Sequence, residues 1–213
     1  MFKSKLRNGL RRLGEKGRAA FDEDFPKIDF QSKHIANCRS IIDREAMLEY
    51  MPENGIVAEI GVFKGDFSQL ILNVTKPSKY YLIDIWGSDR YNDDHLNTVK
   101  SKFRKELDTG QVEIIRALSF EGIESLPDNH LDWVYLDTDH MLETTRKELA
   151  LLLPKMKAGG IIAGHDYIQG NWVGGIRYGV VEAVREVCVN KNWELIYITH
   201  ELTNNPSFAI RKI

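Results

Sequence analysis

Short apolar segments alternate with amphipathic ones along this chain, and that alternation limits the fold more than any other feature of the sequence. Strands are expected over residues 56–61, 79–86, 111–117, 131–140, 159–167, 193–199 and 207–213, and helices over residues 35–50, 67–74, 97–108, 120–126, 142–156 and 179–190. Repeated strand–helix alternation predicts an α/β domain with a doubly wound, mainly parallel seven-stranded sheet and helices on both faces. The last two strands have no helix between them, so they should pair as a C-terminal antiparallel hairpin at one edge.

Composition narrows the class of protein. The chain has 213 residues, 43% of them hydrophobic and 28% charged, which suits one domain with a full core. The formal charge of −2 argues against nucleic acid as a partner. No apolar run reaches the ~18 residues of a transmembrane segment, and no apolar segment near Met1 resembles a secretory signal. With two cysteines far apart, these features predict a cytoplasmic protein with reduced thiols.

The first residues differ from the rest, so the chain is divided into a basic N-terminal extension (1–34) and one domain (35–213). Residues 1–20 carry seven Lys and Arg against Glu15 alone, with Phe2, Leu6, Leu10 and Leu13 at helical spacing. Such a segment could pack as a simple arm, contact a partner or lie on a membrane surface. We expect a protein contact within a homodimer.

The segment VAEIGVFKGDFS, residues 57–68, joins an apolar strand to the next helix. Glu59 stands near the strand end, and Gly61 and Gly65 permit a tight turn close to a ligand. A site for a nucleoside triphosphate would need a Gly-Lys-Ser/Thr sequence, which this turn does not have. The charge of Glu59 would repel a pyrophosphate and attract a cation. A ligand that carries an ammonium and a sulfonium fits this chemistry.

These residues, with YLIDIW at the second strand and DWVYLDTDH and GGIIAGHDY farther on, resemble the class I S-adenosylmethionine (SAM)-dependent methyltransferases. The bacterial subfamily of metal-dependent sugar and macrolide O-methyltransferases is similar. The resemblance implies a Rossmann-like fold with SAM bound by Glu59, Gly61, Gly65, Asp84, Trp86, Ser119 and Asp137. Asp84 would bind the ribose hydroxyls. Trp86 either covers the adenosine or only packs, and Ser119 contacts adenine, caps the following helix, or does both.

Acidic and imidazole side chains follow two strands that should be neighbours. Asp137, Asp139 and His140 end one strand, and His165 and Asp166 end the other. Carboxylates gathered together favour a bound cation, and oxygen ligands with an imidazole suit Mg²⁺, Mn²⁺ or Ca²⁺. The similar O-methyltransferases hold a divalent ion at these strand ends, which implies Asp137, Asp139, His165 and Asp166 as its ligands. Without a metal, His140 or His165 would act as the general base.

The function expected from the resemblance is transfer of a methyl group from SAM to a hydroxyl of a small molecule or a saccharide. Asp137, His140 and His165 are the candidate catalytic residues. The alternative is a SAM-binding domain without catalysis that serves as a scaffold. The segment 167–179, rich in glycine and aromatic residues, is either a lid over the acceptor or a plain connection.

Overall fold

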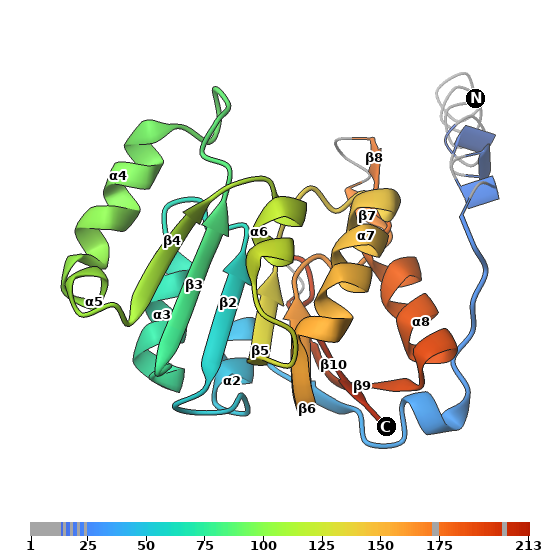
Figure 1. Cartoon of the computed structure of the whole chain (residues 1–213). Helices are drawn as coiled ribbons and strands as arrows, with labels where there is room; N and C mark the ends of the chain where they lie inside the picture. The colour runs from blue at the N-terminus through green and yellow to red at the C-terminus, as the bar shows by residue number, and fades with distance from the viewer. Residues whose placement is uncertain are drawn as a thin grey trace.

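A computed structural model describes residues 14, 16–17, 19–20, 22–23, 25–171, 175–201 and 204–213. The described chain forms a central sheet of eight strands in the order β1-β9-β10-β6-β5-β2-β3-β4 (Figure 1). The strands are β1 (Arg39–Ile41), β2 (Ile56–Ile60), β3 (Lys79–Asp84), β4 (Val112–Arg116), β5 (Leu131–Leu136), β6 (Met156–Gly164), β9 (Trp193–Thr199) and β10 (Phe208–Lys212). All neighbouring pairs are parallel except the two that β10 makes.

Helices cover both faces of the sheet. They are η1 (Ser32–His34), α2 (Arg44–Leu48), α3 (Asp66–Thr75), α4 (Asp93–Lys102), α5 (Arg104–Asp108), α6 (Ser119–Ser125), α7 (Leu142–Leu152), η2 (Leu153–Lys155) and α8 (Val180–Lys191). In Figure 1, α6, α7 and α8 lie in front of the sheet, and α2 and α3 lie behind it. The doubly wound architecture predicted from the alternation is confirmed.

Side-chain alternation in β2 separates two hydrophobic cores. Ala58 and Ile60 face the core under α6, α7 and α8, whereas Val57 faces the core under α2, α3 and α4. Each fully buried aliphatic side chain contributes ~1.5–3 kcal/mol through burial. Because both faces are apolar, the central strands are fixed in register, and their carboxyl ends meet at one edge of the sheet. This edge, at the top in Figure 1, is called the carboxyl edge below.

The sheet has eight strands rather than the predicted seven, because the expected helix over residues 35–50 was partly wrong. Residues 39–41 form β1, which pairs in parallel with β9, and the helix is confined to Arg44–Leu48. Asp43 starts that helix by accepting a hydrogen bond from the backbone N–H of Ala46 at 2.7 Å. Residues 39–41 form main-chain hydrogen bonds with β9 despite their helical pattern. Because β9 is distant in the sequence, this pairing could not be predicted from the neighbouring residues.

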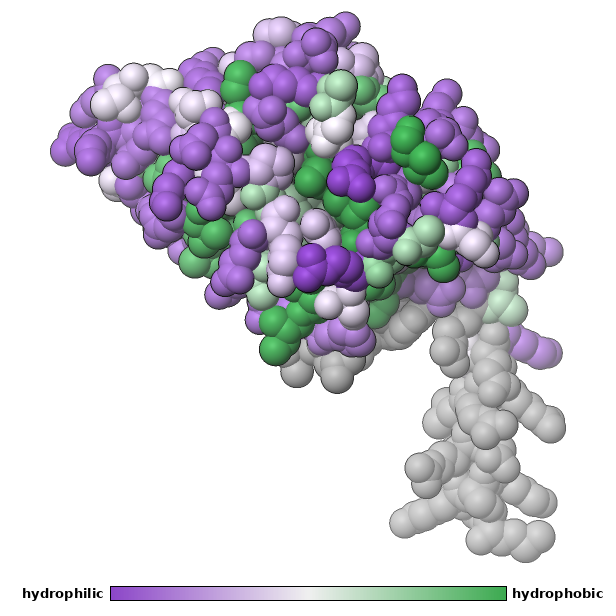
Figure 2. Space-filling model, turned by 90° about the horizontal axis from the view of Figure 1, so that it is seen from below, coloured by the Kyte–Doolittle hydropathy of each residue, from purple (hydrophilic) through white to green (hydrophobic). Residues whose placement is uncertain are grey.

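The C-terminal hairpin of β9 and β10 is confirmed, but it does not form an edge of the sheet. β10 lies between β9 and β6, and β1 is the edge strand beyond β9. A second, two-stranded sheet of β7 (Gly170–Asn171) and β8 (Ile176–Arg177) rises above the carboxyl edge from the segment 167–179 (Figure 1). Seen from below, the molecule is covered largely by hydrophilic residues with apolar ones scattered among them (Figure 2).

The expected basic helix over residues 1–20 lies mostly outside the described residues. The following stretch is attached to the domain, because Asp22 bonds the Arg177 guanidinium at 2.8 Å and Phe25 lies under it at 4.1 Å. Within the described part of the chain, no helix combines the length and the apolarity needed to cross a bilayer.

Candidate functional site

The turn after β2 has room only for glycine at its first position. Gly61 has a φ of 90°, and its N–H donates to the Ile83 carbonyl at 2.9 Å. A Cβ atom on Gly61 would lie 1.9 Å from the Asp137 carbonyl oxygen, which is closer than any packed contact. Phe63 and Gly65 also have positive φ, 55° and 72°. Gly65 is the N-cap of α3, and Asp66 is its first helical residue.

Asp84, at the end of β3, holds this turn in place. Its Oδ2 accepts hydrogen bonds from the backbone N–H groups of Val62 and Phe63, both at 2.8 Å. The Trp86 indole N–H donates to the Phe63 carbonyl at 2.8 Å, and the Trp86 side chain is fully buried. Of the two roles considered for Trp86, packing is therefore the one its position fits. The exposed apolar side chain after Asp84 is Ile85, which the sequence analysis missed.

Glu59 does not face the turn with a free negative charge, as the sequence analysis expected. Its side chain is buried behind β2 and accepts a 2.6 Å hydrogen bond from the Tyr80 hydroxyl. Burial raises the pKa of Glu59 to about 8, so the carboxyl group is mainly protonated at neutral pH. Glu59 therefore joins β2 to β3 from within the core.

Ser119 is the first residue of α6, and Leu118 precedes it as the N-cap without a side-chain hydrogen bond. The capping role considered for Ser119 is therefore wrong. Ser119 lies instead near Glu148 of α7, a fully buried carboxyl group that accepts a 3.0 Å hydrogen bond from Thr138. Burial raises the pKa of Glu148 to about 7, against hydrogen bonds from Ser119 and Thr138. The three side chains link the end of β5 to the start of α6.

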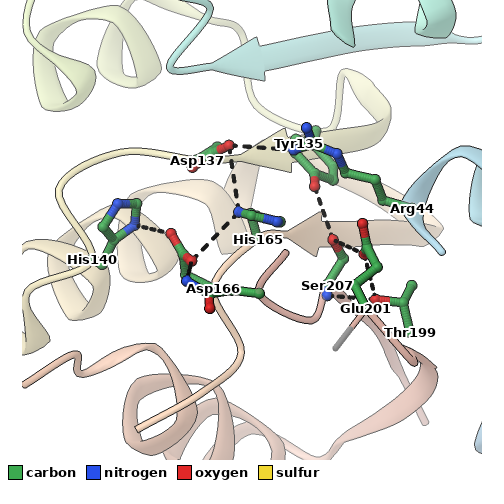
Figure 3. A network of polar contacts seen from close by, with 10 residues as sticks. Arg44, Tyr135, Asp137, His140, His165, Asp166, Thr199, Glu201 and Ser207 are labelled. Carbon is green, nitrogen blue, oxygen red and sulfur yellow. Dashed lines mark hydrogen bonds and ion pairs between the residues drawn. The ribbon is translucent and has the colours of Figure 1, made fainter. Parts of the chain in front are cut away.

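Acidic and imidazole side chains converge where β5 and β6 end, as predicted (Figure 3). His140 Nδ1 lies 2.9 Å from Asp166 Oδ2. His165 Nδ1 lies between the two acids, 3.8 Å from Asp137 Oδ2 and 3.5 Å from Asp166 Oδ1. Asn205, in the segment between β9 and β10, donates a short hydrogen bond to Asp166 Oδ1. Asp166 is therefore held from both sides, and it fixes the orientation of the His140 ring.

The His140–Asp166 pair also sits on unusual backbone. Both residues have positive φ, 64° and 56°, a conformation that costs a non-glycine residue ~1–2 kcal/mol. Burial alone would raise the pKa of Asp166, but hydrogen bonds from His140 and His165 lower it far below its ordinary value. Burial would lower the pKa of His140, but Asp166 and Asp137 raise it overall. The pair therefore favours a carboxylate beside an imidazole that readily accepts a proton.

Asp137, His140 and Asp166 place one ligand atom each within 4.8 Å of one another. Ligand atoms around one divalent ion at ~2.0–2.6 Å can be up to about 4–5 Å apart, so this spacing is compatible with a metal. Two carboxylates and one imidazole suit Mn²⁺ better than Mg²⁺, which prefers an all-oxygen set. The residues present therefore fit a divalent ion, provided that His140 gives up its hydrogen bond to Asp166.

The structure does not bring all four predicted metal ligands together. Asp139 turns away to the start of α7, where it accepts hydrogen bonds from the Met141 N–H at 2.9 Å and the Thr144 hydroxyl at 2.8 Å. His165 lies beside both acids but outside the group whose ligand atoms converge. His140 takes its place in that group.

Arg44 is a further residue at the carboxyl edge that the sequence analysis missed. Its guanidinium lies 4.6 Å from the centre of the Phe67 ring, and Nη1 is 3.8 Å from Asp137 Oδ2 (Figure 3). Nothing in the local sequence marks Arg44, because α2 reaches this edge only through its packing on α3 and the neighbouring strands.

The family is decided by a sequence match that spans the glycine turn and both acidic strand ends. Residues 58–167, about half of the chain, match the family model of a methyltransferase domain. The chain belongs to this methyltransferase family. No curated protein matches it in sequence.

Solved structures share the fold of this methyltransferase at low sequence identity. Cofactor-bound Rv0187 from MTB is 15% identical, with a TM-score of 0.60 over 93% of this chain and 88% of that chain. A SAM-dependent methyltransferase from Aquifex aeolicus is 18% identical, with a TM-score of 0.58 over 94% and 98%. SMU.1697c from Streptococcus mutans, in complex with SAH, is 14% identical, with a TM-score of 0.57 over 79% and 95%. The prediction of a class I methyltransferase is confirmed.

The carboxyl edge of this methyltransferase thus has two halves. The half at β2 and β3, called the turn half, consists of the Gly61–Gly65 turn, Asp84 and Ile85. The half at β5 and β6, called the acid–histidine half, consists of Asp137, His140, His165 and Asp166. Asp137 is next to both, because its backbone N–H donates to the Ile60 carbonyl at 2.8 Å.

Proposed function

We propose that this methyltransferase transfers the methyl group of SAM to a hydroxyl oxygen of a small molecule or a saccharide. The acceptor oxygen forms a bond to the methyl carbon while the carbon–sulfur bond breaks, and its electron pair stays on sulfur to give S-adenosylhomocysteine (SAH). The hydroxyl proton must leave at the same time. Because the sulfonium already activates the methyl group, positioning of the two reactants supplies much of the rate.

The turn half is our candidate for the cofactor, through Gly61, Gly65 and Asp84. Ligands of parallel α/β sheets bind beyond the carboxyl ends of the strands, and this turn brings bare backbone to that edge. Asp84 keeps acceptor capacity on Oδ1, which receives one hydrogen bond of 3.2 Å from the described residues, from the Trp86 N–H. We assign the ribose hydroxyls to Asp84, and the adenine to the space beside Ile85 and Ser119. Trp86 contributes by supporting the turn through its bond to Phe63, and Glu59 contributes by joining β2 to β3.

The observation that best supports methyl transfer to an oxygen is the His140–Asp166 pair. A neutral imidazole that donates from Nδ1 to Asp166 must present Nε2 as an acceptor, which can take the hydroxyl proton. Asp166 then stabilises the imidazolium. Asp137 and His165, directly beside the pair, position it and shield it from water.

A metal-assisted form of the same reaction is the second candidate, favoured by the convergence of Asp137, His140 and Asp166. A divalent ion held by these three residues would supply Lewis acidity and lower the pKa of the acceptor hydroxyl. In that case the three side chains bind and orient the ion, and the base role passes from His140 to another acceptor of the proton.

Apolar side chains beside the acid–histidine half indicate what kind of acceptor molecule would fit there. Met141 and Ile176 are each 47% exposed, and the Tyr178 ring lies 4.9 Å from the ring of His140. The Gly179 N–H donates to the His140 carbonyl at 2.8 Å, so the end of the β7–β8 segment is joined to this half. These contacts favour an acceptor with an apolar portion next to its hydroxyl.

Incubation with methyl-labelled SAM and a panel of hydroxyl compounds tests the proposal. The panel should contain phenols, catechols, hydroxylated macrolides and free sugars. We expect label in at least one product as a methyl ether, and full turnover in excess EDTA if His140 is the base. Loss of turnover in EDTA with recovery in Mn²⁺ or Mg²⁺ would favour the metal. Binding of SAH without transfer to any acceptor would favour the scaffold alternative.

We also propose residues 35–213 as the methyltransferase domain and residues 1–34 as a basic extension that contacts a second copy in a homodimer. The bond between Asp22 and Arg177 supports an ordered attachment of the extension close to the β7–β8 segment. Deletion of residues 1–20 should halve the mass measured by light scattering. An unchanged mass would refute the role of the extension in a dimer.

A further inference from the structure

Residues 25–34, called the strap below, run beside α8 and are fastened there at two places (Figure 1). The Arg177 guanidinium, just before α8, lies 4.1 Å from the centre of the Phe25 ring. Farther along the helix, the Arg185 guanidinium lies 5.4 Å from the centre of the Phe30 ring. An arginine over an aromatic ring is an attractive contact, so the strap is held along the helix rather than at one point.

Arg177 connects the N-terminal extension to the segment above the carboxyl edge. Its side chain is buried at the end of β8, where Nε donates to Asp22 Oδ1 at 2.8 Å and Nη2 donates to Glu182 Oε1 at 2.6 Å. Nη1 donates to the Gln169 carbonyl at 2.8 Å and to the Tyr178 carbonyl. The rigid fork of the guanidinium therefore joins the extension, α8 and both ends of the β7–β8 segment.

The β7–β8 segment needs this support. Each of its strands has two residues, and a two-stranded sheet is marginally stable in water even when it is longer. Its base is tight: a Cβ atom on Gly170, which pairs with Arg177, would lie 2.3 Å from the Ile176 carbonyl oxygen. The Tyr178 N–H closes the base by donating to the Gln169 carbonyl at 2.9 Å.

The base of the segment contacts the proposed general base. The Tyr178 ring lies 4.9 Å from the His140 ring, and the Gly179 N–H donates to the His140 carbonyl at 2.8 Å. His140 has a φ of 64°, a backbone conformation that persists only where the surrounding structure holds it. Displacement of the segment would therefore free His140 to change its orientation.

We propose that Arg177 is a positioning residue for the methyl transfer. Asp22 and Phe25 hold its guanidinium, and Arg177 in turn holds the backbone that contacts His140. The N-terminal extension then serves the site of its own chain, in addition to any contact with a second copy. The effect on the rate rests on the proposed role of His140, whereas the effect on the β7–β8 segment does not.

Hydrogen exchange measured by mass spectrometry tests the first step without an acceptor. The double variant Asp22→Asn, Phe25→Leu removes both contacts that the extension makes with the guanidinium. The amides of Tyr178 and Gly179 should then exchange about 10- to 100-fold faster than in the wild type, the range for loss of a charged hydrogen bond. Amides of β2 and β5 should exchange as they do in the wild type.

Asp29→Asn is the matched control, because Asp29 is an exposed acid of the strap and its replacement removes the same charge. Exchange in this variant should equal that of the wild type. Asp22→Glu keeps the carboxylate and should retain most of the protection. Replacement of Arg177 itself is a poorer test, because it leaves Glu182 buried without its cation and destabilises the fold whatever the role of Arg177.

Steady-state rates test the second step. With an acceptor that the panel identifies, the double variant should lower kcat about 10-fold or more, as expected when a catalytic group is misplaced. Its affinity for SAH should stay within twofold. A residue that only stabilises α8 would lower the free energy of unfolding without this separation of kcat from cofactor binding.

Unchanged exchange at Tyr178 and Gly179 in the double variant would overturn the proposal, and so would equal acceleration throughout the chain. Faster exchange with an unchanged kcat would show that Arg177 serves stability alone. If the wild type methylates no acceptor, the proposed function fails, while the exchange experiment still supports or overturns the link from Asp22 to the β7–β8 segment.

Discussion

The two halves of the carboxyl edge are built in different ways. The turn half comes from one continuous stretch, residues 57–86, and its shape is set by backbone: the positive φ of Gly61 and the two N–H groups bonded to Asp84. The acid–histidine half is made of side chains from two separate segments, around residues 137–140 and 165–166, and Asn205 from a third segment bonds Asp166. Only the sheet brings these segments together.

This difference predicts different sensitivities. A site made of backbone should tolerate changes of exposed side chains and fail when a Cβ atom is added at its tightest point. A site made of side chains should fold normally after a truncation and lose chemistry instead. The predictions that follow use this contrast, and they run from the largest expected effect to the smallest.

Replacement of His140 should have the largest effect. His140→Ala removes the acceptor of the hydroxyl proton, so methyl transfer should fall about 10²- to 10⁴-fold, the usual contribution of a general base. The affinity for SAH should stay within twofold. Initial rates with an acceptor found in the panel, together with calorimetry, measure both quantities.

The matched control for this prediction is His130→Ala. His130 bonds the Tyr81 hydroxyl at 3.1 Å near the start of β5, at the other end of the strand that leads to Asp137. Its replacement should leave the rate unchanged. Equal losses in the two variants would show that His140 acts through stability rather than chemistry.

Gly61→Ala should be the most damaging small change in the turn half. The new methyl would overlap the Asp137 carbonyl oxygen, and the left-handed backbone adds strain, so the free energy of unfolding should fall by about 3 kcal/mol. Gly110→Ala has a similar φ of 75° but open space around it, and should cost about 1 kcal/mol. Urea unfolding compares the two. If Gly61→Ala lowers the free energy of unfolding no more than Gly110→Ala does, the Asp137 carbonyl oxygen does not restrict position 61.

Glu59 should change how the free energy of unfolding depends on pH, an effect that is smaller per pH unit than the loss expected for Gly61→Ala. The unfolded chain releases the Glu59 proton near pH 4.5, whereas the folded chain keeps it until about pH 8. The folded state therefore binds more protons in this window, and the free energy of unfolding should fall as pH rises, by at most about 1.4 kcal/mol per unit.

Glu59→Gln keeps the shape and the hydrogen bond from Tyr80 but has no proton to lose. Its free energy of unfolding should vary less between pH 5 and 8 than that of the wild type. Because Glu148 titrates in both proteins, the difference between the two curves measures the contribution of Glu59 alone. Parallel curves for the two proteins would mean that Glu59 is ionised in the fold and faces a cation.

Local sequence was sufficient for seven of the eight strands of the sheet and for most residues of the turn half. The strand–helix alternation, the two glycines and the acid that ends β3 are all consequences of neighbouring residues. Convergence of Asp137 with Asp166 also followed, because adjacent parallel strands end together. Asp139 lies apart from the converging ligand atoms for a local reason: it stands three residues beyond the end of β5, where its carboxylate accepts hydrogen bonds from the Met141 N–H and the Thr144 hydroxyl.

Other features depend on contacts between distant segments and could not be predicted. β1 exists because β9 offers main-chain partners, and Arg44 reaches the site because α2 packs on α3. The direction of the Glu59 side chain depends on which residues of β2 face each side of the sheet. Glu59 lies on the face toward α3, where the Tyr80 hydroxyl donates a hydrogen bond to it. A strand-terminal acid in sequence does not show which face it occupies.

Binding of SAH to three proteins tests the division of the carboxyl edge most directly, without knowledge of the acceptor. Wild-type protein should bind SAH. Asp84→Ala should bind it about 10- to 100-fold more weakly, through loss of a charged hydrogen bond and of the bonds that hold the turn. His140→Ala should bind it like the wild type. Equal weakening in both variants, or no binding by wild-type protein at millimolar SAH, would contradict the account.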